Sequence, residues 1–523
     1  MSARAGSRRR SGGREARRAL RTAGPDKGQR PVEPGLEGGA YRPLSDAEVK
    51  RVHGAALDIL ERLGMGEPIP ILQELALEKG CHLNDQGRLC FPRGFVEDII
   101  AGAARRFVLH GRDPKHDLRI EGTRVHFGTG GAAVKVLDSK TGHYRPSTLV
   151  DLYDFARLVD QLDNVSWFTR CVVATDLPDM FELDMNTLYA CIAGTTKHIG
   201  TNFYLAEHVP PAIALLDTAL GGEGRFRKRP FCKVHSSPVV SPLRYGADNA
   251  EVAVACAREG MPVNVIIAAQ SGATAPAALA GTLVQTVAET LAGLILVNLV
   301  APGHPVIFSN WPFVSDLRTG AFTGGGGEIA VLNAAAAQIT NFYDLPSGVA
   351  AGMADSKLPD GQAGYEKALT TAMAGLAGAN LVYESAGMLA SLLGCSFESF
   401  VIDDEILGFV ERGLRGIEVT DETLSLQVIE DAVNGPGHYL GHPQTLEVME
   451  SEYLYPVLGD RHTPDEWEEM GATDIRARAR AQVAEILGSH YPDYLSPEVD
   501  AALRERFPIK LPASAMRPDS GRW

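Results

Sequence analysis

Between residues 165 and 415 the chain alternates between short apolar runs and longer helical stretches, and this pattern restricts the fold more than any other feature. Eight runs can be counted, each followed by a helical stretch or by a loop that leads to one. They are Val165–Ala174, His198–Tyr204, Cys232–Val240, Pro262–Ala269, Pro305–Ser309, Ser347–Met353, Asn380–Ser385 and Phe400–Asp403. Eight β/α units over roughly 250 residues are typical of a TIM barrel.

An open, doubly wound sheet is the alternative arrangement of such units. Dinucleotide-binding sheets of that kind carry a G-x-G-x-x-G turn after a strand, and no such turn follows any of the eight runs. We therefore predict an α/β fold, a TIM (β/α)8 barrel with an N-terminal helical and β-hairpin segment and a C-terminal helical extension.

The flanking segments differ from the barrel in pattern. Ser45–Leu63 begins with a capping box and continues with helical spacing, whereas His116–Ser147 alternates like a β-hairpin or meander. The predicted organisation has five parts. They are a basic disordered tail at 1–40, helices and hairpin at 41–150, the barrel at 151–416, a helical extension at 417–510 and a tail at 511–523.

Charge and cysteine usage exclude several classes of protein. The 523 residues have a net charge of −15, which argues against a general nucleic-acid surface, although Met1–Arg30 holds ten arginines and lysines against two acids. The most apolar stretch, Ala273–Ala301, is broken by polar residues and is interpreted as a buried helix. The seven cysteines, odd in number and without C-x-x-C spacing, indicate a reduced cytoplasmic protein with no metal site.

In a TIM barrel the active site is built from residues at the carboxyl ends of the strands. Polar, acidic and aromatic residues recur where the apolar runs end. Contact with solvent explains the charges there, but it explains the aromatic residues less well. The main candidates are Asn202, Tyr204, His235, Gln270, Trp311, Asp355, Lys357, Tyr383 and Glu384.

Aromatic rings combined with scattered carboxylates suit a cationic ligand, because quaternary ammonium groups donate no hydrogen bond. The residues that two other kinds of site require are not found at these positions. The T-G-G-G-G-E turn at Thr323–Glu328 has no following Lys-Ser/Thr, so it is interpreted as a turn that opens a helix. Lys357 lies in a loop beside Asp355, which favours a paired, charged lysine over a Schiff-base nucleophile.

Four stretches carry a resemblance to a known family. They are F-G-T-G-G at Phe127–Gly131, D-S-K-L-P-D-G-Q-A-G-Y-E-K at Asp355–Lys367, G-A-N-L-V-Y-E-S-A-G-M-L-A-S at Gly378–Ser391 and G-P-G-H-Y-L-G-H-P-Q-T-L at Gly435–Leu446. From about Tyr41 to Pro508 the chain resembles the trimethylamine methyltransferase family. It is most similar to the branch without pyrrolysine that includes glycine betaine:corrinoid methyltransferase.

The resemblance implies a TIM-barrel methyltransferase that moves a methyl group from a methylated amine to the Co(I) of a separate corrinoid protein. That partner would carry the corrinoid and dock over the open end of the barrel, so no cofactor is expected to be bound tightly by this chain. A homo-oligomer is also expected. The alternatives are another barrel enzyme, such as a lyase or decarboxylase, and a non-catalytic binder of betaines or of the corrinoid protein.

The resemblance places the pyrrolysine of the trimethylamine enzyme within a few residues of Asp355–Asp360, where this chain has only standard residues. We therefore expect a betaine-like or carnitine-like quaternary amine, whose nitrogen is already a good leaving group. Strand-end position gives each site residue a hypothetical role. Glu384 and Asp355 would supply negative potential as the catalytic residues; Trp311, Tyr204 and Tyr383 would form an ammonium cage; His235, Asn202, Gln270 or Lys357 would hold a carboxylate.

Overall fold

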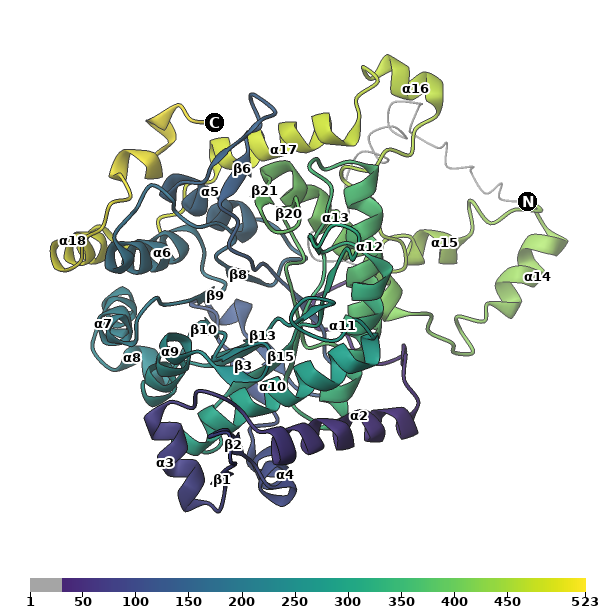
Figure 1. Cartoon of the computed structure of the whole chain (residues 1–523). Coiled ribbons are helices and arrows are strands. Elements are labelled where there is room, and N and C mark those ends of the chain that lie inside the picture. Colours follow the sequence, from purple (N-terminus) through teal and green to yellow (C-terminus); the bar gives the residue numbers. More distant parts are fainter. Residues whose placement is uncertain (1–30) are drawn as a thin grey trace, which may run out of the picture.

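A computed structural model describes residues 31–523 and shows a barrel of eight parallel strands surrounded by helices (Figure 1). In barrel order the strands are β5 (His126–Phe127), β8 (Trp167–Thr169), β9 (His198–Thr201), β10 (Cys232–Ser236), β13 (Val263–Ile267), β15 (Val306–Asn310), β18 (Ser347–Ala350) and β19 (Leu381–Tyr383). A parallel bridge between Gly128 and Trp167 and a hydrogen bond from Ser166 N to Phe127 O (2.7 Å) join the first strand to the second. The predicted TIM barrel is confirmed.

The predicted eighth strand and the predicted start of the barrel are wrong. Seven of the eight apolar runs contain a barrel strand, but Phe400–Asp403 lies inside helix α13 (Phe397–Arg415). Ser396 caps this helix, and Phe397, Phe400 and Val401 are buried at helical spacing. The missing strand is β5, which lies in the segment predicted as a hairpin, so the barrel begins before residue 151 and β18 and β19 are its seventh and eighth strands.

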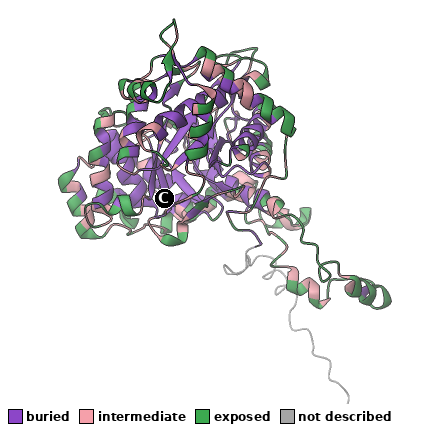
Figure 2. Ribbon diagram, turned by 90° about the horizontal axis from the view of Figure 1, so that it is seen from below, coloured by how far each residue is buried: buried purple, intermediate pink, exposed green. Residues whose placement is uncertain are grey.

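Helices surround the barrel, and its interior is buried throughout (Figure 2). They are α5 (Leu149–Asp160), α6 (Met180–Gly194), α7 (Val209–Ala219), α9 (Ala247–Arg258), α10 (Leu279–Val300), α11 (Gly327–Phe342), α12 (Gly361–Leu376) and α13. Some of these helices, such as α6 and α10, are buried on nearly every side because other elements cover them. Among the described residues only α10 is long and apolar enough to cross a membrane, and 83% of its most apolar window is buried. It contacts α2, α3, α9 and α11, so the interpretation of this stretch as a buried helix is confirmed.

Additional short strands follow the barrel strands at their carboxyl ends and surround the open end of the barrel. One sheet consists of β14 (Gln270–Ser271), β16 (Phe313–Ser315) and β17 (Phe322–Thr323). A second consists of β6 (Lys135–Leu137), β7 (Tyr144–Pro146), β20 (Met388–Leu389) and β21 (Gly394–Cys395). A two-stranded ribbon, β11 (Val239–Val240) and β12 (Arg244–Tyr245), lies beyond β10. We call the region that these strands surround the barrel mouth.

The N-terminal segment packs on the outside of the barrel. It contains α2 (Asp46–Asp58), the short π-helix η1 (Ile59–Leu63), α3 (Pro70–Glu78), β1 (His82–Leu83), β2 (Leu89–Cys90), α4 (Arg93–Gly102), β3 (Phe107–Leu109) and β4 (Leu118–Ile120). The Ser45 and Glu48 capping box is present as predicted. Most of the predicted tail lies outside the described residues. Residues 31–40, however, are ordered against the barrel, since Gly35 N and Gly38 N donate to the carbonyls of Val125 and Thr123 (2.8 and 2.9 Å).

The C-terminal extension contains α14 (Leu426–Asn434), α15 (Pro443–Val448), α16 (Pro464–Glu469), α17 (Ile475–Ser489) and α18 (Pro497–Arg506). Helices α16 and α17 are separated where the chain turns through left-handed Gly471 and Ala472. The predicted tail at 511–523 is anchored. Trp523 packs edge-on against Phe397 (5.0 Å between ring centroids) and donates from Nε1 to Asp154 (2.9 Å).

Candidate functional site

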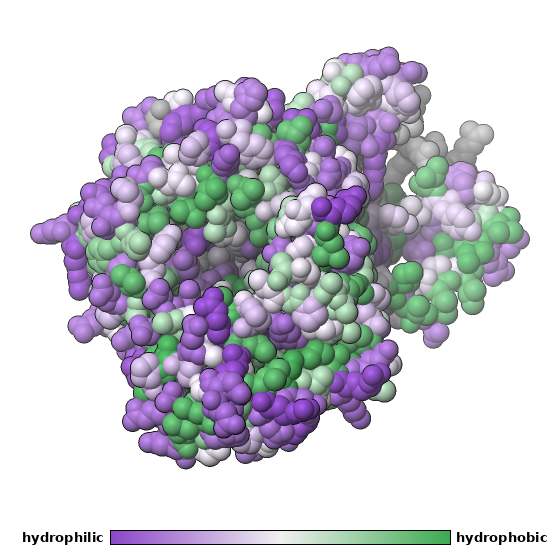
Figure 3. All heavy atoms as spheres, viewed as in Figure 1, coloured by the Kyte–Doolittle hydropathy of each residue, from purple (hydrophilic) through white to green (hydrophobic). Residues whose placement is uncertain are grey.

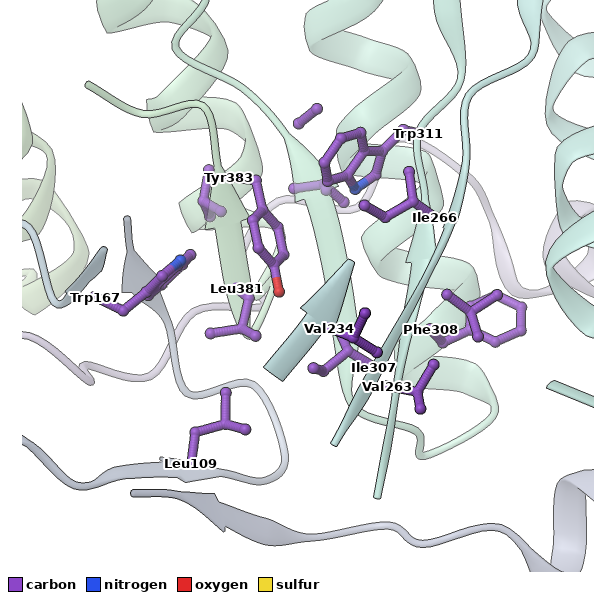
Figure 4. Packing of buried hydrophobic residues seen from close by; sticks show 14 of the residues in the cluster. Leu109, Trp167, Val234, Val263, Ile266, Ile307, Phe308, Trp311, Leu381 and Tyr383 are labelled. Carbon is purple, nitrogen blue, oxygen red and sulfur yellow. The ribbon is translucent and has the colours of Figure 1, made fainter. Parts of the chain in front are cut away.

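Aromatic side chains converge on Tyr383, the last residue of β19. Its ring is 5.2 Å from that of Trp167, 5.1 Å from the imidazole of His235 and 5.3 Å from the ring of Trp311, measured between centroids. Figure 4 shows Tyr383 between the two tryptophans. These residues come from four different strands or strand ends, so barrel closure is what brings them together. They form an aromatic cluster at the inner end of the barrel mouth.

Glu384 follows Tyr383 and is held in an unusual environment. Its backbone is left-handed (φ 64°), which is uncommon for a residue with a side chain and is concentrated at functional sites. The side chain is buried, and its Oε2 has no hydrogen-bond partner among the described residues. Burial raises the pKa of Glu384 to about 8, although Arg170 and Lys367 act in the opposite direction. A cation placed beside this carboxyl group would therefore favour its ionised form.

The F-G-T-G-G motif makes room for this site. A Cβ atom on Gly130 would lie 2.7 Å from Oε1 of Glu384, and one on Gly131 would lie 2.9 Å from Oε2. A Cβ on Gly128 would overlap the Trp167 ring. The three glycines thus allow the backbone after β5 to approach the glutamate and the tryptophan closely.

Cationic side chains lie beside the same cluster. Lys233 is fully buried in β10, and its Nζ is 5.0 Å from the ring centroid of Trp167 and 5.5 Å from that of Tyr383. Desolvation lowers the pKa of Lys233 to about 7. Arg170, just after β8, donates from Nε to the side-chain oxygen of Asn202. Burial lowers the pKa of Arg170. Burial, Lys233 and Arg170 together lower the pKa of His235, which is neutral at physiological pH.

Several buried polar atoms in this region have no hydrogen-bond partner among the described residues. They are Nζ of Lys233, Oε2 of Glu384, the hydroxyl of Tyr383, Nε1 of Trp311 and both amide atoms of Asn310. Buried polar groups are normally hydrogen-bonded, and exceptions concentrate at functional sites.

Asp355 and Lys357 lie apart from the aromatic cluster, in the loop between β18 and α12. Asp355 Oδ1 accepts hydrogen bonds from Gly324 N and from the Ser391 hydroxyl, both at 2.8 Å. It therefore connects three loops of the barrel mouth. Lys357 is exposed, and its Nζ donates to the backbone oxygen of Asp355 (2.7 Å). The adjoining T-G-G-G-G-E turn opens α11, as predicted.

The remaining predicted residues lie around the rim. Tyr204 is 38% exposed, and within residues 31–523 it makes no ring contact with Trp311 or Tyr383. Asn202 is half-buried and bound to Arg170. Gln270 is half-buried in β14, where it pairs in register with Phe313 of β16. The structure thus brings Trp311 and His235 into ring contact with Tyr383, next to Glu384, and it links Asn202 to this cluster through Arg170.

Strand-end reasoning did not identify Lys233 or Trp167. Both lie inside barrel strands, two residues before His235 and Thr169, and therefore point to the same side of the sheet as those residues. Lys233 could have been identified from the sequence, because a lysine within an apolar strand is unusual.

The fold and the site define a TIM-barrel protein with a buried cluster of aromatic and ionisable side chains at the carboxyl ends of its strands. Residues 10–510 match the model of the family described as trimethylamine methyltransferase (MTTB). A trimethylamine methyltransferase MttB from Methanosarcina thermophila is 34% identical over 460 residues, 87% of this chain and 94% of that protein. A glycine betaine methyltransferase from Desulfitobacterium hafniense is 32% identical over 468 residues, 89% of this chain and 96% of that protein.

The chain belongs to the trimethylamine methyltransferase family. The expected resemblance and the expected class of enzyme, a methyltransferase, are confirmed. Among solved structures, the monomethylamine methyltransferase MtmB of Methanosarcina barkeri covers 86% of this chain and 95% of its own length. The identity is 12% and the TM-score is 0.47.

Proposed function

We propose that the protein transfers a methyl group from a quaternary amine that also carries a carboxylate, a betaine, to the Co(I) of a corrinoid held by a separate protein. The observation that carries this proposal is the pairing of opposite chemistries around Tyr383. Aromatic faces and Glu384 suit the ammonium group, whereas Lys233 and Arg170 suit a carboxylate. Family membership supports methyl transfer from a methylated amine to a corrinoid protein.

The ammonium end would lie against Trp311 and Tyr383, with Glu384 beside it. A trimethylammonium group offers no hydrogen-bond donor, so ring faces and a carboxylate are the groups that can hold it. The unpartnered Oε2 of Glu384 is available for this contact. Binding of a cation would lower the pKa of Glu384 from about 8, so the glutamate would release its proton as the substrate enters.

The carboxylate end would be bound by Lys233 or Arg170. Lys233 Nζ has no acceptor among the described residues, and a bound carboxylate would restore its charge. His235 is neutral and would contribute a hydrogen bond instead of a charge. For a betaine the two charge changes would compensate, because Glu384 would lose a proton as Lys233 gains one.

The methyl transfer itself requires no proton from the protein. A quaternary nitrogen leaves as a neutral tertiary amine when a nucleophile displaces it from the methyl carbon, so the site has only to orient that methyl group and exclude water. Co(I) is the nucleophile, and the corrinoid is the methyl acceptor. We propose a positioning role for Asp355, which ties together the loops that surround the entrance.

The test uses free cob(I)alamin as the acceptor, with glycine betaine, choline and trimethylamine as donors. The appearance of methyl-Co(III) is followed by absorbance. We expect transfer from glycine betaine, weaker transfer from choline, which lacks the carboxylate, and none from trimethylamine. Equal rates of methyl transfer from all three donors would exclude recognition of the carboxylate. Binding of glycine betaine without any methyl-Co(III), also with corrinoid proteins as acceptors, would instead support a non-catalytic binder.

A further inference from the structure

Three buried side chains from different barrel strands lie close together inside the barrel. They are Trp167 of β8, Lys233 of β10 and Tyr383 of β19. Lys233 Nζ is 5.0 Å from the ring centroid of Trp167 and 5.5 Å from that of Tyr383, and the two ring centroids are 5.2 Å apart. The three groups therefore stand at the corners of a nearly regular triangle. We call them the inner triad.

Each member of the inner triad carries a hydrogen-bond donor without a partner. Lys233 Nζ, Trp167 Nε1 and the hydroxyl of Tyr383 are buried and have no hydrogen-bond partner among residues 31–523. Buried donors are normally satisfied, so three unsatisfied donors on neighbouring side chains indicate a place for a ligand. An anion suits them best, because the oxygen atoms of a carboxylate accept hydrogen bonds from charged and neutral donors alike.

The inner triad lies deeper in the barrel than the groups assigned to the ammonium end of the substrate. Lys233 is the second residue of β10 and precedes His235 by two positions, whereas Trp311 follows the last residue of β15 at the barrel mouth. In Figure 4 the hydroxyl group lies at the end of the Tyr383 ring that is farther from Trp311. One side chain, Tyr383, thus contacts Trp311 with its ring and carries its hydroxyl on the side away from that tryptophan.

Arg170 is the other buried cation near the aromatic cluster, and it already has partners. Its Nε donates to the side-chain oxygen of Asn202, and the carboxyl group of Asp184 is close enough to act on its charge. Lys233 Nζ, in contrast, has no hydrogen-bond acceptor within the described part of the chain. A carboxylate in the site would therefore gain more from Lys233 than from Arg170.

The dimensions of the barrel interior suit a short molecule that carries both charges. In the view of Figure 1 the helices surround the strands, and Figure 3 shows a hollow at the middle of this ring. Lys233 Nζ and the ring centroid of Trp311 lie 5.5 and 5.3 Å from the ring centroid of Tyr383. A small zwitterion can therefore contact the lysine and the tryptophan at the same time.

We propose that the inner triad is a carboxylate subsite and that a betaine enters the barrel with its carboxylate first. This inference rests on the proposed function, because it takes the substrate to be a betaine. The carboxylate accepts hydrogen bonds from the three donors of the triad, and the trimethylammonium group packs against Trp311 nearer the mouth. This orientation directs an N-methyl group toward the open end of the barrel, from which a corrinoid held by a separate protein can approach.

The first test removes one donor and keeps its ring. Tyr383→Phe should weaken binding of glycine betaine about tenfold in calorimetry, because a hydrogen bond to a charged group is lost, and should leave choline binding unchanged. The matched control is Tyr365→Phe, which removes an exposed hydroxyl from α12 and should change neither affinity. Equal weakening of both ligands by Y383F, or no weakening of either, would overturn the carboxylate-first orientation.

The second test divides the substrate into its two charged parts. At constant ionic strength, acetate should tighten the binding of tetramethylammonium severalfold, because the two ions then occupy adjacent subsites and attract each other. Acetamide, which has the same shape without the charge, should have no effect, and Lys233→Met should abolish the effect of acetate. No acetate effect in the native protein, or its persistence in K233M, would overturn the proposed subsite. An acetate effect in a protein that forms no methyl-Co(III) from glycine betaine would instead overturn the proposed function and keep the subsite.

Discussion

Replacing Glu384 by glutamine should stabilise the protein while it impairs function. The ordinary pKa of 4.5 and the folded value of about 8 differ by about 3.5, and each unit corresponds to about 1.4 kcal/mol. Ionised Glu384 therefore destabilises the folded state by up to about 5 kcal/mol in the absence of ligand. Glutamine has the same shape and carries no charge to desolvate, so it removes this cost.

The sign of the pH dependence follows from proton binding. Between pH 4.5 and pH 8 the folded protein holds a proton on Glu384 that the unfolded chain has released, so stability falls as pH rises through that range. The advantage of E384Q over the native protein should grow by about 3 kcal/mol between pH 6 and pH 9. Urea unfolding at the two pH values measures it.

Glu289 provides the matched control. It is also buried, but it accepts hydrogen bonds from the Ser241 hydroxyl (2.6 Å) and from Leu243 N (2.8 Å). The amide of E289Q cannot accept all of these, so this variant should be less stable and should keep its methyl transfer. A loss of stability in E384Q that is equal at pH 6 and pH 9 would refute the assignment of a buried, unpaired carboxyl group at position 384.

Three further predictions concern the site and its support. K233M should weaken binding of glycine betaine roughly tenfold or more and leave choline binding nearly unchanged, as measured by calorimetry, because the variant lacks the cation for the carboxylate. W311A should weaken binding of both compounds by about 1–2 kcal/mol, with W311F intermediate and Y365A, on the exposed face of α12, without effect. D403N should lower stability by about 3–5 kcal/mol in thermal unfolding, because it leaves buried Lys367 without its partner at 2.7 Å.

Much of the fold can be predicted from the sequence, because seven barrel strands are apolar runs that end in polar residues. Strand β5 cannot be predicted, because it has only two residues and lies in a segment that alternates like a hairpin. Phe400–Asp403 is apolar enough for a strand, but its residues belong to the buried face of a long helix. Distinguishing the two requires the helical spacing from Phe397 onward, which a short window does not show.

The site could be predicted only where strand ends define it. Tyr383, Glu384 and Trp311 follow from position in a barrel strand or just after one. Lys233 and Trp167 depend on which side of the strand faces the interior, and their proximity arises from barrel closure. Asp355 has the residue type of a catalytic acid, yet its hydrogen bonds to neighbouring loops can be seen only in the folded chain.

The central claim is that the methyl group leaves the ammonium nitrogen and arrives on cobalt. The most direct measurement supplies glycine betaine labelled with ¹³C in its N-methyl groups, together with cob(I)alamin and the protein. We predict that labelled methyl-Co(III) and dimethylglycine form in equal amounts, and that W311A slows both equally. Consumption of the betaine with release of carbon dioxide and no label on cobalt would contradict the account and indicate a decarboxylase.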